Sequence, residues 1–481
     1  MSNFPPLQTG FHALGAAYFS PIQATPLSDV RLAAWNIDLA DELGLPKGLE
    51  QHTDTCDLLA GNAKLASPAA ITTVYSGHQF GVWAGQLGDG RAILLGELNG
   101  QEIQLKGTGR TPYSRRGDGR AVLRSSIREY LCSEAMHGLG IPTTRALALV
   151  TSSEEVYREE VETAAVVTRV APSFLRFGHF EHFFHHNLHD NLQPLADYAI
   201  ARYYPDCQNI NNPYQALLET VISRTAELIA AWQAVGFCHG VMNSDNMSLL
   251  GLTIDYGPFG FLDGFDANHI CNHSDHHGRY TYAKQPEIGL FNLQCFAQAL
   301  LPLLDRDAAI AALNGYQAQF ERAQLNKFRT KLGLSTTETD DEQLFYDLLE
   351  QMHASHTDWT LFWRGLADFD SHPDAVNAPL RDQFLDRPAF DAWATDYKAR
   401  LNREASQDAE RKIRMCQVNS KYVLRNHLAE QAIRNAQAGD FSEIETLRKL
   451  LARPYDEQPA MQAYAALPPD WANTLSVSCS S

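Results

Sequence analysis

The chain has 481 residues, of which 44% are hydrophobic, 10% aromatic and 20% charged. This length exceeds one average domain and this composition supplies a sizeable core, so a mini-protein and a wholly disordered chain are both excluded. The 57 acidic residues outnumber the 39 lysines and arginines and give a formal net charge of −18. Such a charge argues against a surface built to hold nucleic acid or an anionic membrane.

The N-terminal segment shows no targeting signal, because its first lysine or arginine is Arg31 and it has no long apolar core. Nowhere do roughly 18 uncharged apolar residues run together. The eight cysteines are spread out without a C-x-x-C pair, which indicates neither a disulfide scaffold nor a structural zinc site. We therefore expect a cytoplasmic protein with neither nucleic acid nor a membrane as partner.

The N-terminal part of the chain has the pattern of a small sheet. Residues 1–70 contain scattered turn residues and are expected to form an arm packed on the sheet. Residues 75–105 alternate short apolar runs with many glycines, which predicts β-hairpins. Helical spacing over 121–138 predicts one helix, and apolar runs on either side of an acidic turn predict strands within 146–170.

From residue 190 the period becomes helical, most clearly at 215–235, and residues 285–455 alternate helical segments with polar connections. The sequence therefore predicts an α+β protein of two lobes. After the arm, a β-rich N-lobe with one key helix spans 71–180, a helical C-lobe with a C-terminal extension spans 181–455, and a flexible tail spans 456–481.

A glycine-rich turn is the first candidate for binding phosphate. The chain has neither a P-loop nor a G-x-G-x-x-G motif. The backbone amides of Gly88 and Gly90 are placed to approach phosphate, with Arg91 as a charged partner. Glycines that serve only to make the turn are an equally good explanation.

A lysine and a glutamate form the second candidate feature. Lys106 ends a predicted strand and Glu129 lies on the predicted helix after it. Protein kinases have a strand lysine and a helix glutamate in this order, and the two side chains pair. Because Arg124 and Arg128 flank Glu129, an ion pair on the helix surface is the alternative.

The segment HGVMNSDN, followed by DYG, has the spacing of a kinase catalytic loop and its metal-binding motif. His239 and Asn246 fall at the expected positions, and Asp255 begins the DYG. Val241 occupies the position of the catalytic aspartate, so the usual base is missing. Asp245 is the remaining carboxylate and a substitute base, unless it only caps a turn or orients a neighbour.

Four segments together resemble one known family: YSGHQFGVWAGQLGDGRA, LKGTGRTPYSRRGDGRAVLRSSIREYL, TRVAPSFLRFGHF and HGVMNSDNMS with IDYGPFGFLD. They are similar to the selenoprotein O family of protein adenylyltransferases, also called YdiU, and the similarity covers nearly the whole chain. The resemblance implies a protein-kinase-like fold in which ATP lies flipped relative to a kinase. It also implies transfer of AMP to hydroxyl side chains of proteins.

Matched motif by motif, the resemblance implies a set of site residues. Asp245 is the proposed base, Asn246 and Asp255 are the ligands of Mg²⁺ or Mn²⁺, and Glu129 supports the lysine. A divalent metal and cations suit expulsion of pyrophosphate. Without the resemblance, Arg169 and Arg176 are better explained as surface or sheet-edge charges. The positions implied to contact nucleotide are Gly88, Gly90, Arg91, Lys106, Asp118, Gly119, Arg169, Arg176 and Asp255.

Two histidine-rich segments invite a metal-binding interpretation. Neither contains an obvious complete ligand set, so we expect structural roles for them instead. The first holds His179, His182, His185, His186 and His189, and the second holds His269, Cys271, His273, His276 and His277.

The tail contains Cys479, at a position where the resemblance implies selenocysteine in eukaryotic members of the family. A thiol on a tail can react with a partner cysteine, and Cys271 is the candidate. A Cys271–Cys479 disulfide making activity redox-dependent is therefore one hypothesis, and a free tail thiol is the other.

Three functions are compatible with the sequence. The leading one is an adenylyltransferase that moves AMP from ATP to Ser, Thr or Tyr of protein substrates, with release of pyrophosphate. The second is a pseudokinase that binds nucleotide and acts as a scaffold, which Val241 favours. The third is a conventional kinase that uses Asp245 as its base.

Overall fold

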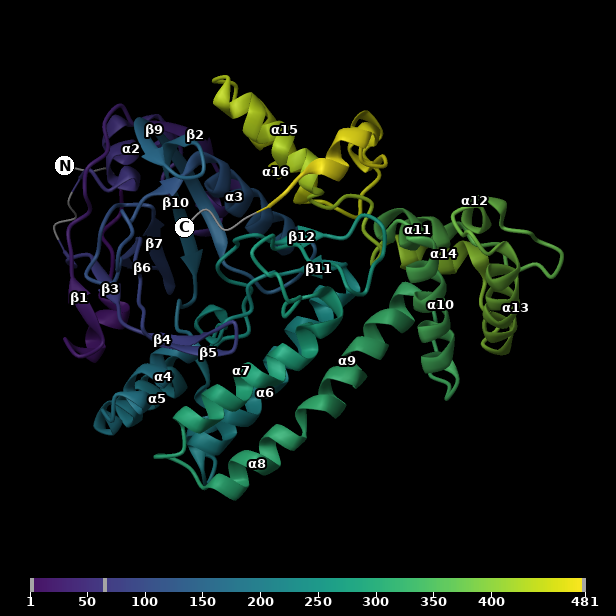
Figure 1. Ribbon diagram of the computed structural model, residues 1–481, viewed down its shortest axis with the longest axis horizontal. Helices are drawn as coiled ribbons and strands as arrows, with labels where there is room; N and C mark the ends of the chain where they lie inside the picture. Colours follow the sequence, from purple (N-terminus) through teal and green to yellow (C-terminus); the bar gives the residue numbers. More distant parts are fainter. Residues whose placement is uncertain (1–3, 64–66, 478–481) are drawn as a thin grey trace.

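One antiparallel sheet of eight strands organises the N-terminal part of the chain (Figure 1). The computed structural model describes residues 4–63 and 67–477. Strand β8 (Ala121–Val122) pairs with β10 off the main path. The path across the sheet runs β1 (Phe19–Pro21), β3 (Ile71–Thr73), β6 (Ala92–Leu98), β7 (Gln101–Lys106), β10 (Val161–Ala171), β9 (Arg145–Tyr157) and β2 (Arg31–Trp35).

The predicted hairpins are confirmed in the inner strands. β6 and β7 pair in antiparallel register, with Ala92 opposite Lys106. The connecting Asn99 and Gly100 have φ of 50° and 77°, and positive φ at both central residues is what a tight two-residue hairpin turn needs. A second hairpin, β4 (Ser76–Gln79) and β5 (Val82–Gln86), forms a separate two-stranded sheet.

The N-terminal segment is part of the sheet rather than only an arm on it. It supplies both edge strands, β1 and β2, together with the helices α1 (Ile37–Glu42) and α2 (Thr53–Ala60). Leu39 and Leu58 of these helices share a buried hydrophobic cluster with Ile103 and Val166 of the inner strands. One face of the sheet is therefore closed by helices that lie in the chain between its first two strands and the other six.

The other face of the sheet carries α3 (Leu123–Gly138), in the place where the sequence predicts a helix. The helix begins two residues later than predicted because 121–122 join the sheet as β8. α15 (Asn426–Gln437) and α16 (Ser442–Leu451) return from the far end of the chain and pack against α3. Arg448 of α16 donates to Asn36 Oδ1 at 3.1 Å and to Asp38 Oδ2 at 2.7 Å.

The rest of the chain is helical. Around α6 lie α7, α8 and α9, and α10 to α14 gather at one end of the molecule (Figure 1). The hydrophobic core of these distal helices also includes Cys238 and Phe328. The only strands among the described residues here are the short β11 (Phe237–Cys238) and β12 (Gly260–Phe261). The helices are α4 (Phe177–His185), α5 (Leu192–Tyr203), α6 (Pro213–Ala234), α7 (Gln285–Ala299), α8 (Arg306–Asn314), α9 (Tyr316–Lys331), α10 (Asp341–Ser355), α11 (Trp359–Gly365), α12 (Ala378–Arg381), α13 (Arg387–Arg403) and α14 (Asp408–Cys416).

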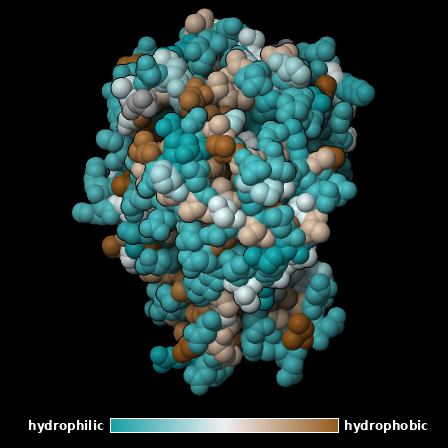
Figure 2. Space-filling model, turned by 90° about the vertical axis from the view of Figure 1, so that its right-hand side faces the viewer, coloured by the Kyte–Doolittle hydropathy of each residue, from teal (hydrophilic) through white to brown (hydrophobic). Residues whose placement is uncertain are grey.

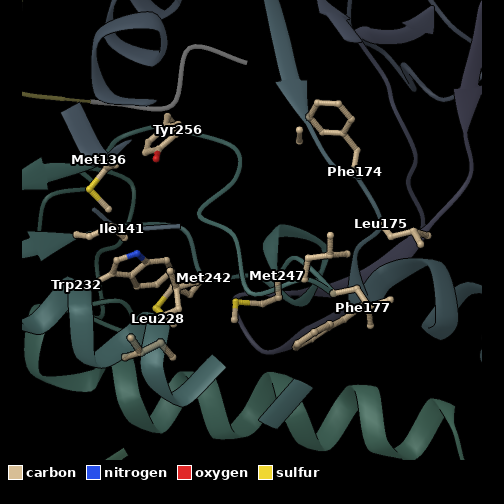
Figure 3. Close-up of a cluster of buried hydrophobic side chains, with 14 of the residues drawn as sticks. Met136, Ile141, Phe174, Leu175, Phe177, Leu228, Trp232, Met242, Met247 and Tyr256 are labelled. Carbon is tan, nitrogen blue, oxygen red and sulfur yellow. The ribbon is translucent and has the colours of Figure 1, made fainter. Parts of the chain in front are cut away.

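A shared hydrophobic core joins the sheet part to the helical part. Met136 of α3 and Trp232 of α6 belong to one buried cluster (Figure 3). Met242 and Met247, three and one residues outside the pair Asp245 and Asn246, are also buried in it. The loop between them is therefore anchored on both sides, which fixes its polar residues relative to the sheet.

The end of the molecule formed by the distal helices presents a mostly hydrophilic face, with hydrophobic residues scattered over it (Figure 2). Within 4–63 and 67–477, none of the helices combines the length and the apolar character needed to cross a bilayer.

Candidate active site

A cleft of about 800 Å³ lies where the sheet meets the loops of the helical part. The glycine turn before β6, the end of β7, the loop 113–120 and the loops 241–246 and 255–258 form its walls. All the positions predicted to contact nucleotide or metal, together with the predicted base, line this one cleft: Gly88, Gly90, Arg91, Lys106, Asp118, Gly119, Arg169, Arg176, Asp245, Asn246 and Asp255.

The cleft differs in charge from the chain as a whole. Eight lysine and arginine side chains line it against four aspartates, although the chain carries a net charge of −18. A concave surface lined with fixed cations attracts anions and concentrates them. The cleft is therefore chemically suited to a polyanion such as the phosphates of a nucleotide.

Lys106 and Glu129 form a buried ion pair, with Nζ 2.5 Å from Oε2. The other oxygen, Oε1, accepts a hydrogen bond from Arg169 Nε. Burial raises the pKa of the Glu129 carboxyl, but the neighbouring Arg169 and Lys106 charges outweigh it and hold the pKa below its usual value. Glu129 is buried, so it does not take part in a surface ion pair.

Burial and the Arg169 charge lower the pKa of Lys106 to about 8, and the Glu129 carboxylate only partly opposes them. One carboxylate thus serves two cations. The arrangement leaves an excess of positive charge at the point where β7 and β10 reach the cleft.

Asp255 is the second carboxylate shared by two cations. Arg169 Nη2 donates to its Oδ1 at 2.8 Å, and Arg176 Nη1 donates to its Oδ2. Burial raises the pKa of this carboxyl, but the Arg176, Arg169 and Lys106 charges hold it well below its usual range. Both arginines are buried, which excludes the surface role that is the better explanation without the resemblance.

The backbone at Asp255 is left-handed, with φ of 57°. The DYG segment itself forms no strand, because only 260 and 261 pair as β12. Side chains of β10 and of the segment before α4 hold Asp255, so its conformation is set by contacts distant in sequence. His239 Nε2 lies 2.9 Å from the carbonyl oxygen of Ile254 and links the two loops.

Asp245 lies on a short 3-10 helix (Ser244–Asn246) and is buried. Gln79 Nε2 donates to its Oδ2 at 3.2 Å, and Oδ1 has no hydrogen-bond partner among the described residues. Burial raises the pKa of the carboxyl to about 7. Asp245 lines the cleft, and a carboxylate whose pKa lies near neutrality is suited to accept a proton.

Asn246, next to Asp245, donates from Nδ2 to the carbonyl oxygen of Val241 at 3.1 Å. This hydrogen bond commits the amide nitrogen and leaves Oδ1 as the atom able to bind a cation. An amide oxygen and a carboxylate oxygen from Asp255 are the kind of donors that Mg²⁺ and Mn²⁺ prefer.

Neighbouring atoms come so close to two glycines of the cleft that no side chain would fit there. A Cβ added at Gly88, where φ is 120°, would lie 2.6 Å from the Tyr113 ring. One added at Gly119 would lie 2.1 Å from the carbonyl oxygen of Gly109. Asp118, beside Gly119, pairs with Arg158 at 2.7 Å.

Several residues that line the cleft are absent from the sequence-based set. Gln79 contacts Asp245, Tyr75 lies under the Arg176 guanidinium at 5.0 Å, and Arg158 pairs with Asp118. Gln79 and Tyr75 stand in the first of the segments on which the resemblance is based, so their place there was an available signal. Arg158 lies in the acidic turn, where nothing local marked it.

Of the two cysteines in the hypothetical disulfide, only Cys271 lies among the described residues. Cys271 is a buried free thiol whose Sγ donates to the carbonyl oxygen of Cys238 at 3.4 Å, and burial raises its pKa well above the usual value. Cys479 lies outside the described residues. The tail does reach this region, because the His273 N–H donates to the carbonyl oxygen of Val477 at 3.1 Å.

Two histidines of the first cluster make structural contacts, as expected. The Arg176 N–H donates to His179 Nδ1 at 3.0 Å, and His182 Nδ1 lies 3.0 Å from Ser76 Oγ. His185 instead approaches His78 and Glu181. The second cluster, around Cys271, takes part in no metal-binding group among the described residues.

Known proteins match the sequence over almost its whole length. The family described as Protein adenylyltransferase SelO matches residues 6–452. The chain is 56% identical to a protein nucleotidyltransferase YdiU of Burkholderia vietnamiensis, over 99% of this chain and 96% of that protein. It is 57% identical to the protein of the same name from Burkholderia multivorans and 56% identical to that of Paraburkholderia xenovorans, each over 98% of this chain and 95% of the relative.

A cationic cleft with a carboxylate facing it and a family match of this extent define a class of nucleotidyltransferase enzymes. The chain belongs to the protein adenylyltransferase SelO family. The predicted resemblance is thereby confirmed.

Proposed function

We propose that the protein transfers AMP from ATP to a Ser, Thr or Tyr hydroxyl of a protein substrate and releases pyrophosphate. The observation that carries this proposal is the composition of the cleft, where cations predominate and Asp245 is part of the lining. The names of the family and of its relatives support it, because they describe adenylyl or nucleotidyl transfer to protein.

The proposal includes a protein-kinase-like fold of two lobes. The Lys106–Glu129 pair, formed between a strand and a helix of the sheet part, supports it. So does the order of His239, Asn246 and Asp255 in the loops below the sheet. Both are features that kinases use to hold nucleotide phosphates. The likeness to kinases also favours a cytoplasmic enzyme, since the proposed substrates are ATP and the hydroxyl groups of proteins.

The proposed chemistry needs one base and a cationic leaving-group site. The Asp245 carboxylate accepts the proton of the substrate hydroxyl as the hydroxyl oxygen attacks the α-phosphorus. The bond from that phosphorus to the bridging oxygen of the β-phosphate breaks, and both electrons leave with pyrophosphate. Lys106, Arg169 and Arg176 lie where they would neutralise this charge.

Asn246 Oδ1 and Asp255 would hold the divalent metal, Mg²⁺ or Mn²⁺. When bound, the metal supplies further charge neutralisation across the phosphates. The carboxylate of Asp255 is held by two arginines in this structure. Phosphate oxygens are good acceptors for these guanidinium groups, so nucleotide binding would free Asp255 for the metal.

The decisive experiment uses ATP labelled at either the α- or the γ-phosphate, with reduced protein, Mg²⁺ or Mn²⁺ and a mixture of protein substrates. We expect α-label in protein and release of pyrophosphate. Label from the γ-position would show a conventional kinase, and ATP binding without any transfer would show a pseudokinase scaffold. D245N should still bind ATP but lose transfer by about 100-fold or more, whereas D382N, on the distal helices, should behave as wild type.

We also propose that a Cys271–Cys479 disulfide regulates the enzyme. The hydrogen bond between His273 and Val477 supports it, because it brings the tail beside the segment that carries Cys271. Oxidation should change the activity of the wild type but not of C479S, with C416S as the matched control. Equal activity of the oxidised and reduced wild type would exclude this regulation.

A further inference from the structure

A second group of possible metal ligands lies outside the nucleotide cleft, between the β4–β5 hairpin and α4. It consists of His78 from β4 and of Glu181 and His185 from α4. One donor atom from each of the three lies within 4.8 Å of the other two. Glu181 and His185 are four residues apart on the helix, so both side chains point to the same side.

The carboxylate at the centre of this group is poorly compensated in the structure. Glu181 is 0% exposed, and His78 Nδ1 lies 2.7 Å from its Oε2. Its Oε1 has no hydrogen-bond partner among the described residues, and neither has His185 Nε2, although both atoms are buried. Burying a carboxylate without full hydrogen bonding is costly. A cation at this place would satisfy the oxygen and the ring nitrogen together.

Two imidazoles and one carboxylate form a ligand set that zinc uses when a fourth position is left to water. Bonds of about 2.0–2.1 Å to a tetrahedral ion place neighbouring donor atoms about 3.3 Å apart. The donors here need only a small approach to reach that spacing, since 4.8 Å is the upper limit between them. The side chain of His78 is 16% exposed, which gives an ion a route from solvent.

We propose that His78, Glu181 and His185 bind one Zn²⁺ or a similar transition-metal ion, and that this ion fastens the β4–β5 hairpin to α4. The site is independent of the oxygen donors proposed for Mg²⁺, because nitrogen ligands favour transition metals. It does not rest on the proposed transfer reaction.

The position of the hairpin gives this ion a consequence for the cleft. The His78 N–H donates to Ser244 Oγ at 2.7 Å, and the next residue, Gln79, donates to Asp245. The Trp83 ring of β5 lies 4.1 Å from the ring of His185 and covers it. Fixing His78 to α4 would therefore also fix the strand that contacts the loop of Asp245.

The test is a titration of the full chain, freed of metal with a chelator, with Zn²⁺ followed by calorimetry and Co²⁺ followed by absorption spectroscopy. We expect one equivalent of ion per chain, an intense tetrahedral Co²⁺ spectrum and a rise in melting temperature that saturates at one equivalent. Hydrogen exchange over 76–86 should slow when the ion is bound.

Variants locate the ion. H78Q, E181Q and H185Q each remove a direct ligand and should weaken Zn²⁺ binding by at least the roughly tenfold that loss of an outer-shell partner costs, with folding checked by circular dichroism. H189Q is the matched control, because His189 is exposed on the segment just after the same helix. N246A tests whether the ion sits in the nucleotide cleft, and it should leave Zn²⁺ affinity unchanged.

The proposal is overturned if the wild type takes up no Zn²⁺ or if the ligand variants bind Zn²⁺ as tightly as the wild type. It is also overturned if H189Q or N246A loses as much Zn²⁺ affinity as the ligand variants lose. If a ligand variant does not fold, the Co²⁺ spectrum of the wild type still decides. A weak octahedral spectrum, or one unaffected by excess Zn²⁺, would exclude the site.

Discussion

Two carboxylates, the buried Glu129 and the partly exposed Asp255, balance three buried cations at the back of the cleft. Each carboxylate bridges two cations, and Arg169 belongs to both groups. A buried charge that loses its partner is strongly destabilising. The cluster is thus a fixed source of positive potential as well as a structural tie between β7, α3 and β10.

The first prediction concerns Glu129. E129Q keeps the size of the side chain but removes the charge that Lys106 and Arg169 share, so these two cations repel each other without compensation. We expect a loss of about 3 kcal/mol in the free energy of unfolding and weaker ATP binding. Urea unfolding and a nucleotide-binding titration measure both. E430Q, at a half-exposed surface ion pair, should change neither, and wild-type stability of E129Q would contradict the account.

The second prediction concerns Glu102, a buried carboxyl on β7. Burial raises its pKa to about 8, although the Phe174 N–H donates to it at 2.7 Å. The folded state therefore holds the proton more tightly than the unfolded state, whose pKa is near 4.5. Glu102 should make the free energy of unfolding fall as pH rises from about 4.5 to about 8, by up to about 1.4 kcal/mol per pH unit.

Denaturant unfolding of the wild type and E102Q across this pH range measures the effect. The amide should keep the hydrogen bonds and remove the pH dependence due to this site. Parallel stability curves for the two proteins would mean that Glu102 does not titrate in this range.

Among the elements, the β4–β5 hairpin contacts the proposed base directly. A Cβ added at Gly77 would lie 2.8 Å from Asp245 Oδ1 and 2.9 Å from its Cβ. Such distances require the strand or the loop of Asp245 to move. The absence of a side chain at Gly77 therefore sets how near the hairpin comes to this loop.

The third prediction follows from this contact. G77A should lower transfer activity by about tenfold or more, because a small misplacement of reacting groups is costly, while the melting temperature changes little. G365A is the control, since its added Cβ would meet only an ordinary contact of 3.4 Å with Leu380. Steady-state transfer assays and thermal unfolding of both variants give the comparison, and full activity in G77A would show that the hairpin does not position Asp245.

Elements with strong local patterns were predictable from sequence, and elements fixed by distant contacts were not. The periodicity over 121–138 and 215–235 predicted α3 and α6 nearly in full. β2 is a short, half-buried edge strand whose partner β9 lies more than a hundred residues away, so no local pattern marks it. The left-handed backbone at Asp255 likewise depends on arginines from β10 and from the start of α4.

The candidate site shows the same division. The motifs and the resemblance predicted the nucleotide contacts, the metal ligands and the base, and all of these residues line the cleft. The group of His78, Glu181 and His185 could not be predicted, because His78 is 103 residues from Glu181 in sequence. Only the folded hairpin brings the third ligand to the pair on α4.

At the scale of the whole molecule, helices near the C-terminal end of the chain pack against the N-terminal sheet part. α15 and α16 cover α3, and Arg448 bridges α16 to Asn36 and Asp38 near the N-terminus. The side chain of Arg448 is 2% exposed and also pairs with Glu445. The sheet part therefore depends for its stability on residues that follow the entire helical part.

The fourth prediction tests this dependence. R448M should lower the free energy of unfolding by about 1–3 kcal/mol, because it removes the hydrogen bonds of a buried guanidinium to Asn36, Asp38 and Glu445. K449M is the matched control, since the Lys449 side chain is 66% exposed. Denaturant unfolding measures the difference in the free energy of unfolding, provided that its dependence on denaturant concentration is the same in both variants. Equal denaturation midpoints for the two variants would contradict a role for α16 in closing the molecule.

This closure also has a consequence for synthesis on the ribosome. The contact between Asn36 and Arg448 spans 412 residues, so at elongation rates of about 5–20 residues per second roughly 20 to 80 s pass between the two. During that interval the face of α3 that α15 and α16 will cover stays uncovered on the nascent chain. Apolar surface left exposed in this way promotes aggregation, so the nascent chain is most vulnerable before α15 and α16 are made.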